Sequence, residues 1–519
     1  METTSRRDAM RYSHQPMSRP AGGWKRGLSL VCLVLAAAMA SPAQDDQASP
    51  NTATFKTLVT FDGTNGANPG GALVQGPDGY LYGTTVFGGA NNSGTVFKIS
   101  PRGSLVVLYN FCSQPNCTDG AYPDNFGSLA LGNDGNLYGV TFAGGGPSSG
   151  GTVFKITPTG KLSTLYRFCS LANCSDGGNP DGGLVLGDDG NFYGTTLGYF
   201  PGAADDGTVF KVTPQGVLTT LYNFSSSGGG QPTAGVIQAT DGNFYGTSQT
   251  GGLYFQGSVF KITPKGTLTT AHSFCAPPDC ADGIYPLAPV VQGYNGNFYG
   301  TVSSKNGTPG TVFEIDSAGV FTTLYTFCAQ PNCTDGDLPY AANPLTQATD
   351  GNLYGTTMAG GANNTCSNTL GVSCGTIFKI TPQGTLTSVL SFDGAHGANP
   401  TNNNGFVQAT NGALYATVYG GGTNASCNGC GTIVVLSTGL RPFVSLVPKA
   451  GKVGQTIQIL GTNLTGATSV TFNGTAATFK VASDTLIWAA VPAGATNGIV
   501  TVATPTSTLK SNVRFQLLP

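Results

Sequence analysis

The amino-acid sequence predicts an all-β protein: a seven-bladed β-propeller closed by its own N-terminal strand, followed by a small β-sandwich. A glycine-rich motif recurs seven times, an N-terminal segment matches the strand that the seventh repeat lacks, and the pattern stops near residue 440. With 78 Gly among 519 residues and only 9% of residues charged, a mainly helical protein is disfavoured, because Gly destabilises helix interiors.

Residues 1–40 are predicted to be an export signal. Basic residues precede an apolar run from Leu28 to Ala40, and Ala38-Met39-Ala40 fits a cleavage site. The run is shorter than the roughly 20 apolar residues of a membrane span, and no later segment is expected to span a membrane. Met17 is an alternative start, and Arg6-Arg7 leaves twin-arginine export open. We therefore expect a secreted, periplasmic or cell-surface protein in which residues 41–53 form a linker.

Each repeat is predicted to be a four-stranded blade. The motif D-G-N-[LF]-Y-G-T-T, or a close variant, starts at Asp78, Asp134, Asp189, Asp241, Asn295, Asp350 and Asn411. A period of about 55 residues is near the size of a propeller blade. In the third repeat we expect strands at 183–187, 192–196, 207–213 and 217–224. Asp-Gly and Pro-x-Gly turns join them, and Asp-Gly between apolar runs is a strong hairpin signal.

The two ends of the repeat array predict a closed ring. The seventh repeat ends after its third strand at 431–437, whereas residues 54–61 match the fourth strand of the other repeats. Pairing these segments would complete the last blade and remove exposed strand edges. We therefore predict a propeller over residues 54–438, with an array of β-sandwiches or an open solenoid as alternatives.

The topology separates the loops into two faces. The turns between first and second strands, and between third and fourth strands, are short and should form a flat face. The loops between second and third strands and the links between blades are long and varied. Because binding residues concentrate on variable loops of a rigid scaffold, the second face is the predicted binding surface.

The cysteines predict disulfides. Removal of the signal takes away Cys32 and leaves six local pairs: Cys112/Cys117, Cys169/Cys174, Cys275/Cys280, Cys328/Cys333, Cys366/Cys374 and Cys427/Cys430. An even number of Cys in an exported chain indicates disulfides. Zinc and redox chemistry are alternatives, but the CxxC at 427–430 lacks the further Cys or His that a four-ligand zinc site needs.

Several residues of the long loops are candidates for ligand contact. Asp-Gly followed by Pro recurs in six of the seven links, and each Asp is expected to accept hydrogen bonds from its own turn. A ring of these carboxylates that binds Ca²⁺ or a cationic ligand is the alternative, and the link tyrosines could stack on a sugar ring. The candidates are Asp119, Tyr122, Asp176, Asp282, Tyr285, Asp335, Tyr340 and His396.

Other side chains of the repeats are expected to be structural. The motif tyrosines should pack between blades: Tyr82, Tyr138, Tyr193, Tyr245, Tyr299, Tyr354 and Tyr415. His272 stands where other repeats place Tyr in the fourth strand, and we expect it to be a packing residue.

Motifs that would indicate catalysis are absent from the sequence. There is no G-x-S-x-G, H-E-x-x-H or P-loop, so we predict no catalytic residues, no organic cofactor and, apart from the open question of Ca²⁺, no metal. A net charge of -2 provides no basic surface for nucleic acid.

Residues 441–519 are predicted to form a separate β-sandwich. The expected strands include 456–460, 469–472, 486–490 and 499–503, at the short spacing typical of such a fold. Trp488 is expected in its core.

Both regions resemble known families. Residues 442–516 resemble an immunoglobulin-like IPT/TIG domain through Ile459-Leu-Gly-Thr-Asn-Leu464 and Val470-Thr-Phe-Asn-Gly474. The repeats resemble the GloVer-type tandem repeats of exported bacterial choice-of-anchor proteins, through D-G-N-L-Y-G-T-T and G-T-V-F-K-I-T-P-x-G-x-L-T-T-L-Y. These resemblances imply a secreted or surface protein and supply no catalytic residues.

The function hypothesis is therefore an exported, non-catalytic binding or scaffold protein. Its disulfide-braced loops would bind an extracellular glycan or protein, with the C-terminal domain as spacer or second contact. The alternatives are a carbohydrate-active hydrolase or lyase that uses loop carboxylates, and a structural envelope or adhesion protein.

Overall fold

The computed structural model describes residues 53–123, 127–198, 206–224, 229–303, 309–339, 344–363, 374–398, 400, 405–423, 427 and 429–519. All of them belong to one compact unit, Ala48–Pro519. The predicted signal at 1–40, nearly all of the linker, Tyr340 and Cys366 lie outside the described residues. The described elements are β-strands and three short 3-10 helices, η1 (Pro115–Cys117), η2 (Ala172–Cys174) and η3 (Pro331–Cys333), so the chain is all-β as predicted.

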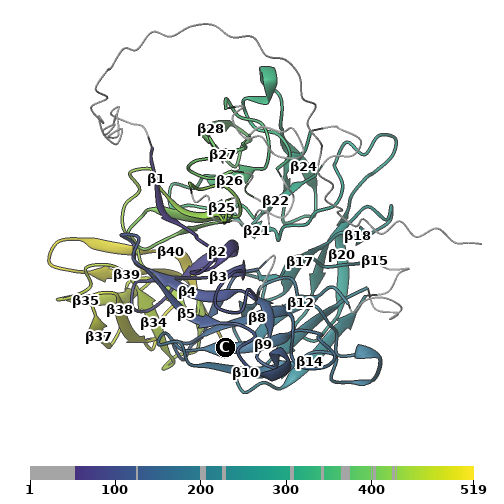
Figure 1. The fold of residues 1–519 in the computed structure, drawn as a ribbon. Helices are drawn as coiled ribbons and strands as arrows, with labels where there is room; N and C mark the ends of the chain where they lie inside the picture. Colours follow the sequence, from purple (N-terminus) through teal and green to yellow (C-terminus); the bar gives the residue numbers. More distant parts are fainter. Residues whose placement is uncertain are drawn as a thin grey trace, which may run out of the picture. The chain divides into compact units, whose positions relative to one another are not determined.

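Six antiparallel sheets each follow one repeat in strand order (Figure 1). Sheet 1 contains β2 (Ala67–Gln75), β3 (Leu81–Phe87), β4 (Thr95–Ile99) and β5 (Leu105–Asn110). Sheet 2 contains β7 (Ala130–Leu131), β8 (Leu137–Ala143), β9 (Thr152–Ile156) and β10 (Leu162–Arg167), with β6 (Ala121–Pro123) also paired to β8. Sheet 3 contains β11 (Val185–Leu186), β12 (Phe192–Thr196), β13 (Thr208–Val212) and β14 (Leu218–Asn223).

The next three sheets repeat this order. Sheet 4 contains β16 (Ile237–Gln238), β17 (Phe244–Ser248), β19 (Ser258–Ile262) and β20 (Leu268–Ser273), and β15 (Gly229–Gly230) pairs with β18 (Thr250–Gly251) beside it. Sheet 5 contains β21 (Val291–Gln292), β22 (Phe298–Val302), β23 (Thr311–Ile315) and β24 (Phe321–Thr326). Sheet 6 contains β25 (Thr346–Gln347), β26 (Leu353–Thr357), β27 (Thr376–Ile380) and β28 (Leu386–Ser391).

Sheet 7 combines the two ends of the repeat region. It contains β29 (Phe406–Gln408), β30 (Leu414–Val418), β31 (Thr432–Ser437) and β1 (Thr54–Thr60). β1 is antiparallel to β31, with Thr54 opposite Ser437 and Thr60 opposite Thr432, and a bulge lies between Thr57 and Val59. The N-terminal segment therefore occupies the fourth-strand position of the last sheet.

Apolar clusters join each sheet to the next. Tyr82 packs with Leu137 and Phe154 between sheets 1 and 2, and Phe61 packs with Leu73 and Tyr415 between sheets 7 and 1. All seven motif tyrosines are buried, which confirms their predicted core role. Glycine follows the motif Tyr in six of the seven repeats, and Ala416 does so in the seventh. The glycine has a steric reason: a Cβ on Gly139 would lie 2.6 Å from the Phe154 ring, which crosses the strand at that point.

The C-terminal domain is a sandwich of two sheets. One has the order β32 (Ser445–Val447), β34 (Thr456–Leu460), β38 (Leu486–Ala490) and β37 (Phe479–Ser483). The other has the order β33 (Ala450–Gly451), β40 (Thr508–Leu517), β39 (Gly498–Ala503), β35 (Ser469–Phe472) and β36 (Thr475–Ala476). Val470, Phe472, Ile487 and Phe515 lie in its core.

The prediction that Trp488 lies in this core is wrong. Ile487 and Ala489 are buried in the sandwich, and because side chains alternate along a strand, Trp488 lies on the opposite face and is half-buried. Its strand partner Gln458 is buried and donates to the carbonyls of Gly132 and Asn133, both at 3.1 Å. This outer sheet face thus contacts the turn between β7 and β8.

No helix within the described ranges is long and apolar enough to cross a membrane.

Candidate functional site

The long loops form what we call the link face: the links between sheets together with the loops between the second and third strands of each sheet. Backbone hydrogen bonds hold the two kinds of loop together. The N–H of Tyr122, in the link to sheet 2, donates to the carbonyl of Ser93 in the loop of sheet 1 at 2.9 Å, and Tyr285 donates equivalently to Gln256. The short turns at the opposite ends of the strands are the turn face.

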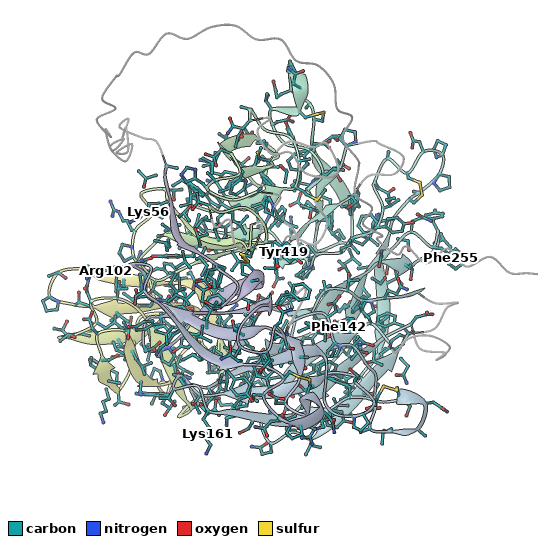
Figure 2. The ribbon with its side chains drawn as sticks, viewed as in Figure 1. Lys56, Arg102, Phe142, Lys161, Phe255 and Tyr419 are labelled. Atoms are coloured by element: carbon teal, nitrogen blue, oxygen red, sulfur yellow. A yellow bond between two sulfur atoms is a disulfide. The ribbon has the colours of Figure 1, made fainter. Side chains whose placement is uncertain are left out.

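Five of the six predicted disulfides are present on the link face. They are Cys112–Cys117, Cys169–Cys174, Cys275–Cys280, Cys328–Cys333 and Cys427–Cys430 (Figure 2). Cys374 is also disulfide-bonded, and its predicted partner Cys366 lies outside the described residues. The predicted disulfides are thereby confirmed at the five described pairs.

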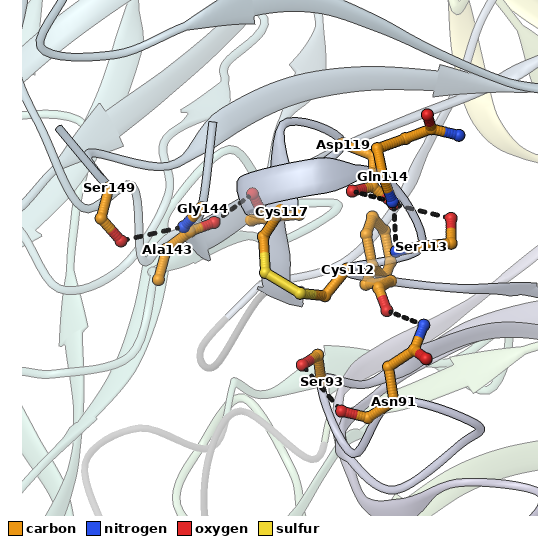
Figure 3. Close-up of a disulfide and its surroundings, with 12 residues drawn as sticks. Asn91, Ser93, Cys112, Ser113, Gln114, Cys117, Asp119, Ala143, Gly144 and Ser149 are labelled. Carbon is orange, nitrogen blue, oxygen red and sulfur yellow. Dashed lines mark hydrogen bonds between the residues drawn. A yellow bond between two sulfur atoms is a disulfide. The ribbon is translucent and has the colours of Figure 1, made fainter. Parts of the chain in front are cut away.

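The carboxylate of Asp119 is enclosed by its own disulfide loop (Figure 3). Its Oδ2 accepts from Tyr109 Oη at 2.8 Å and from both the backbone N–H and the hydroxyl of Ser113 at 2.9 Å. Its Oδ1 accepts from the N–H of Gln114 at 3.2 Å. Asp119 is only 3% exposed, so four donors compensate the cost of burying the charge.

Two other disulfide loops repeat this arrangement. Asp176 accepts from Tyr166 at 2.8 Å, from the N–H and hydroxyl of Ser170, and from the N–H of Leu171. Asp335 accepts from Tyr325 at 2.7 Å and from the N–H groups of Ala329 and Gln330. Burial, together with the hydrogen bond to the carboxylate, raises the pKa of each of these three tyrosines to about 12, so each phenol remains a donor at neutral pH.

The fourth disulfide loop replaces the tyrosine with histidine. His272 Nε2 lies 3.1 Å from Asp282 Oδ2, while Asp282 Oδ1 accepts from the N–H groups of Cys275 and Ala276. The imidazole stacks on Phe321 of sheet 5 with ring centroids 4.2 Å apart. Burial lowers the pKa of His272, and the bond to Asp282 opposes that shift. His272 packs as predicted and also makes a polar contact that the sequence did not indicate.

His396 is held within its own link. Asp393 Oδ2 lies 2.7 Å from His396 Nδ1, and Asp393 Oδ1 accepts the backbone N–H of His396 at 2.9 Å. Asp62 binds its turn in the same way, through Thr64 and Asn65. The prediction that link aspartates accept hydrogen bonds from their own turns is confirmed at Asp62 and Asp393. The other four described link aspartates accept instead from residues five to ten positions earlier, in and before their disulfide loops.

The candidate carboxylates are not brought together. Across the parts of the chain that the structure describes, no three His, Cys, Asp or Glu side chains gather in a way that could hold a metal ion. Each aspartate instead faces its own loop, and binding of Ca²⁺ or of a cationic ligand at these residues stays a prediction without a shared site.

The link residue before proline has an unusual backbone. The six residues with φ between 47° and 55° at this position are Asn68, Tyr122, Asn179, Gln231, Tyr285 and Leu338. The following proline packs on the preceding sheet: a Cβ on Gly94 would lie 2.4 Å from Pro123 Cδ. Tyr122 is 37% exposed and Tyr285 is half-buried, so both predicted ligand contacts reach the link face.

An open cavity of about 510 Å³ also lies on the link face. It is lined by Gly63, Thr64, Gly89, Ala90, Val107 and Asn110. None of these residues is ionisable, so the cavity offers shape and backbone groups but no acid or base.

The turn face carries a hydrogen-bonded cluster of one Asp, one Tyr and one Lys, which was not predicted from the sequence. The hydroxyl of Tyr138 donates to Asp134 at 2.9 Å, and Lys155 bonds the same carboxylate at 2.7 Å. Burial alone would raise the pKa of Asp134. Hydrogen bonds from Lys155, Asn136 and Tyr138 to its carboxylate outweigh burial and lower this pKa to about 2. Asp78–Tyr82–Lys98 and Asp241–Tyr245–Lys261 repeat the group. The available signal was the Lys of F-K-I, which stands beside the Tyr on the next strand.

Sheet 5 contains an exchanged version of this group. Asn295 replaces the Asp and Glu314 replaces the Lys, so Tyr299 now donates to Glu314 at 2.7 Å and accepts from Asn295 at 2.8 Å. The tyrosine keeps its carboxylate partner, although that partner comes from a different strand.

A family model for the Gloeobacter/Verrucomicrobia repeat matches residues 47–175 and 169–369, which together cover more than half of the chain. The chain belongs to the Gloeobacter/Verrucomicrobia repeat family. A model of the IPT/TIG domain matches residues 443–517, the C-terminal sandwich of this family member. Both resemblances seen in the sequence are thereby confirmed.

Comparison of this Gloeobacter/Verrucomicrobia repeat protein with curated proteins gave no match. Among solved structures, a fungal alcohol oxidase of the AA5 family in complex with copper is 12% identical, with a TM-score of 0.49 over 89% of this chain and 100% of that one. A luciferin-regenerating enzyme is 14% identical, with a TM-score of 0.35 over 61% and 92%. Hydrazine synthase of Kuenenia stuttgartiensis is 14% identical, with a TM-score of 0.35 over 60% and 79%. Likenesses this distant carry no argument about activity.

Proposed function

We infer that the seven sheets are the blades of a closed seven-bladed β-propeller. The contacts between sheets 7 and 1 support this because they repeat those between consecutive sheets. Pro69 packs against Gly431 as Pro123 packs against Gly94. Thr417 Oγ1 donates to the carbonyl of Gly71 in sheet 1, as Thr195 of sheet 3 donates to that of Ala234 before sheet 4.

We propose that the protein is exported and acts as a binding or scaffold protein whose link face holds an extracellular glycan or protein. The observation that carries the proposal is the bonding of Asp119, Asp176 and Asp335, whose buried carboxylates accept three or four hydrogen bonds each. These bonds and the adjoining disulfides fix the loops in one conformation, and preorganised loops lose less entropy on binding. Disulfides of this number are typical of oxidising compartments, which supports export.

A hydrolase or lyase that uses these carboxylates is less well supported. A general acid or base must reach the substrate within hydrogen-bond distance, whereas the Asp119 oxygens are occupied by Tyr109, Ser113 and Gln114. No described observation favours a purely structural envelope protein over a binding protein.

The proposal is tested with the purified mature chain and its disulfides formed. Arrays of cell-envelope glycans, other polysaccharides and envelope proteins should give saturable binding without turnover. Failure to bind any of them would contradict the proposal. Turnover of a polysaccharide by the wild-type chain that Asp119→Asn abolishes while the variant stays folded would instead establish the enzyme alternative.

A further inference from the structure

The repeats provide an internal standard for each position of the link face. At the sequence position of Phe87, which ends the second strand of sheet 1, the other six repeats have a small residue: Ala143, Gly198, Thr250, Ser304, Ala359 and Gly420. Phe87 is also 38% exposed. The neighbouring strand residues follow the repeat, so nothing in the motif itself requires an aromatic side chain at this point.

A second aromatic residue, at a link position that varies between repeats, lies directly against Phe87. The residue before the link proline is Asn68 before sheet 1 and Asn179 before sheet 3, and both amides bond the preceding sheet. Asn68 Nδ2 donates to the carbonyl of Tyr419 at 3.1 Å, and Asn179 Nδ2 donates to that of Phe142 at 3.0 Å. Tyr122 occupies this position before sheet 2 and cannot make the equivalent bond.

Tyr122 adopts its backbone conformation at a higher energetic cost than the asparagines at the links before sheets 1 and 3. At φ 55°, Tyr122 is in the left-handed region, which Asn tolerates much better than a bulky residue. Tyr122 is 37% exposed, and its ring lies edge-on to that of Phe87, with centroids 5.6 Å apart. Strain that is retained at an exposed residue is a recognised sign of function.

The described loop beside the two rings presents polar side chains. The loop that follows Phe87 carries the exposed amides of Asn91 and Asn92, and it contributes Gly89 and Ala90 to the open 510 Å³ cavity. Asn91 Nδ2 is bonded to the carbonyl of Phe111, which fixes the amide and leaves its oxygen as an acceptor. Two aromatic rings inclined at 64° to each other, beside amides, suit a ligand with both C–H faces and hydroxyl groups.

We propose that Phe87 and Tyr122 form a binding subsite for a neutral sugar ring of an extracellular polysaccharide. The subsite names the ligand class of the link face and therefore rests on the proposed binding function. One ring stacks on a C–H face of the sugar, the other ring closes one side, and the Asn91 and Asn92 amides bond its hydroxyl groups. Loss of this stacking should weaken affinity about tenfold.

The test restores the residues that other repeats use, in the full mature chain. Phe87→Ala and Tyr122→Asn are each titrated by calorimetry with soluble oligosaccharides of neutral glucans, xylans and mannans. The amide introduced by Tyr122→Asn can bond the Val86 carbonyl as Asn179 bonds that of Phe142. The proposal therefore expects an equal or higher melting temperature for this variant together with the loss of affinity. A purely structural tyrosine would give no such combination.

Leu338→Asn is the matched control, because it introduces the same residue at the equivalent left-handed position before the link proline of sheet 6 and should leave sugar affinity unchanged. Wild-type affinity in both Phe87→Ala and Tyr122→Asn would overturn the subsite while leaving a link-face ligand in place. Binding of an envelope protein but no neutral sugar by the wild-type chain would overturn the sugar proposal and leave the broader function standing. Absence of every ligand would overturn both.

Discussion

The side-chain oxygen of Gln75 accepts a hydrogen bond of 2.9 Å from the backbone N–H of Thr410, 335 residues away in the sequence. Gln292 accepts the same bond from Thr240 and Gln408 accepts it from Thr349, in each case from the turn of the preceding sheet. Sheet 7 is therefore bonded to sheet 1 in the way that consecutive sheets are bonded to each other. This relationship supports a closed ring more specifically than strand pairing alone.

Sheet 5 contains a buried threonine hydroxyl to which a single substitution should supply a hydrogen-bond partner. In sheets 1, 2, 3 and 6, two buried threonine hydroxyls bond across the second and third strands, as between Thr141 and Thr152 at 2.8 Å. Val302 replaces the first threonine in sheet 5, and the buried Oγ1 of Thr311 has no partner among the described residues. We expect Val302→Thr to stabilise the protein by about 1 kcal/mol.

Thermal unfolding checks this, with Thr141→Val as the reverse control that should destabilise by a similar or larger amount. A lower melting temperature for Val302→Thr would show that the partner hydroxyl cannot form the bond.

Asp119 should be a major source of stability for its loop. Asp119→Asn replaces a carboxylate, which only accepts hydrogen bonds, with an amide whose NH₂ would face the N–H and O–H groups that now donate to Asp119. We therefore expect the free energy of unfolding to fall by about 2–3 kcal/mol. Tyr109→Phe removes one donor and should cost about 1 kcal/mol. Denaturant unfolding of both variants checks the order. Unchanged stability in Asp119→Asn, accompanied by loss of ligand binding, would assign the carboxylate to the ligand instead.

Stability should depend on pH through His272. Its pKa in the folded protein is lowered, chiefly by burial, so the folded state favours the neutral imidazole. The contribution is present above the unfolded pKa of about 6.5 and is lost as the pH falls below that value. We expect His272→Tyr, the residue used by three other disulfide loops, to remove this component. Melting temperatures measured from pH 7.5 to 5 should therefore fall less steeply in the variant; identical slopes would exclude His272 as their source.

The exchanged pair of sheet 5 should show coupling. Asn295→Asp alone places a second carboxylate near Glu314, and Glu314→Lys alone removes the carboxylate that accepts from Tyr299 and Asn297. We expect each single variant to be destabilised and the double variant to recover, with a coupling of up to about 1 kcal/mol because the group is partly exposed. A double-mutant cycle measures this term. Additive effects would mean that the two residues act independently.

The sequence was sufficient for features that depend on local pattern. The strands at 192–196, 456–460 and 486–490 begin and end as predicted, and Asp62 and Asp393 bond their own turns. These features follow from short-range turn chemistry and from strand alternation, which a single sequence displays.

Features that depend on side chains meeting across the fold were missed. The bond between Tyr109 and Asp119 joins a strand to a loop beyond a disulfide, and the contact of Phe87 with Tyr122 joins two sheets. Trp488 was misplaced because alternation does not reveal which face of a strand turns inward. Such contacts follow from the register between segments, which residue spacing alone does not fix.

Closure of the ring by β1 is the central claim, and an engineered crosslink tests it most directly. Lys56 and Val435 are partners in the β1–β31 register, whereas Ser437 lies two residues further along β31, opposite Thr54. Lys56→Cys with Val435→Cys should form an intramolecular disulfide in the mature chain, identified by peptide mapping, and the pair Lys56→Cys with Ser437→Cys should form far less. Equal yields for the two pairs, bridges between molecules, or no bridge at all would contradict the closed propeller.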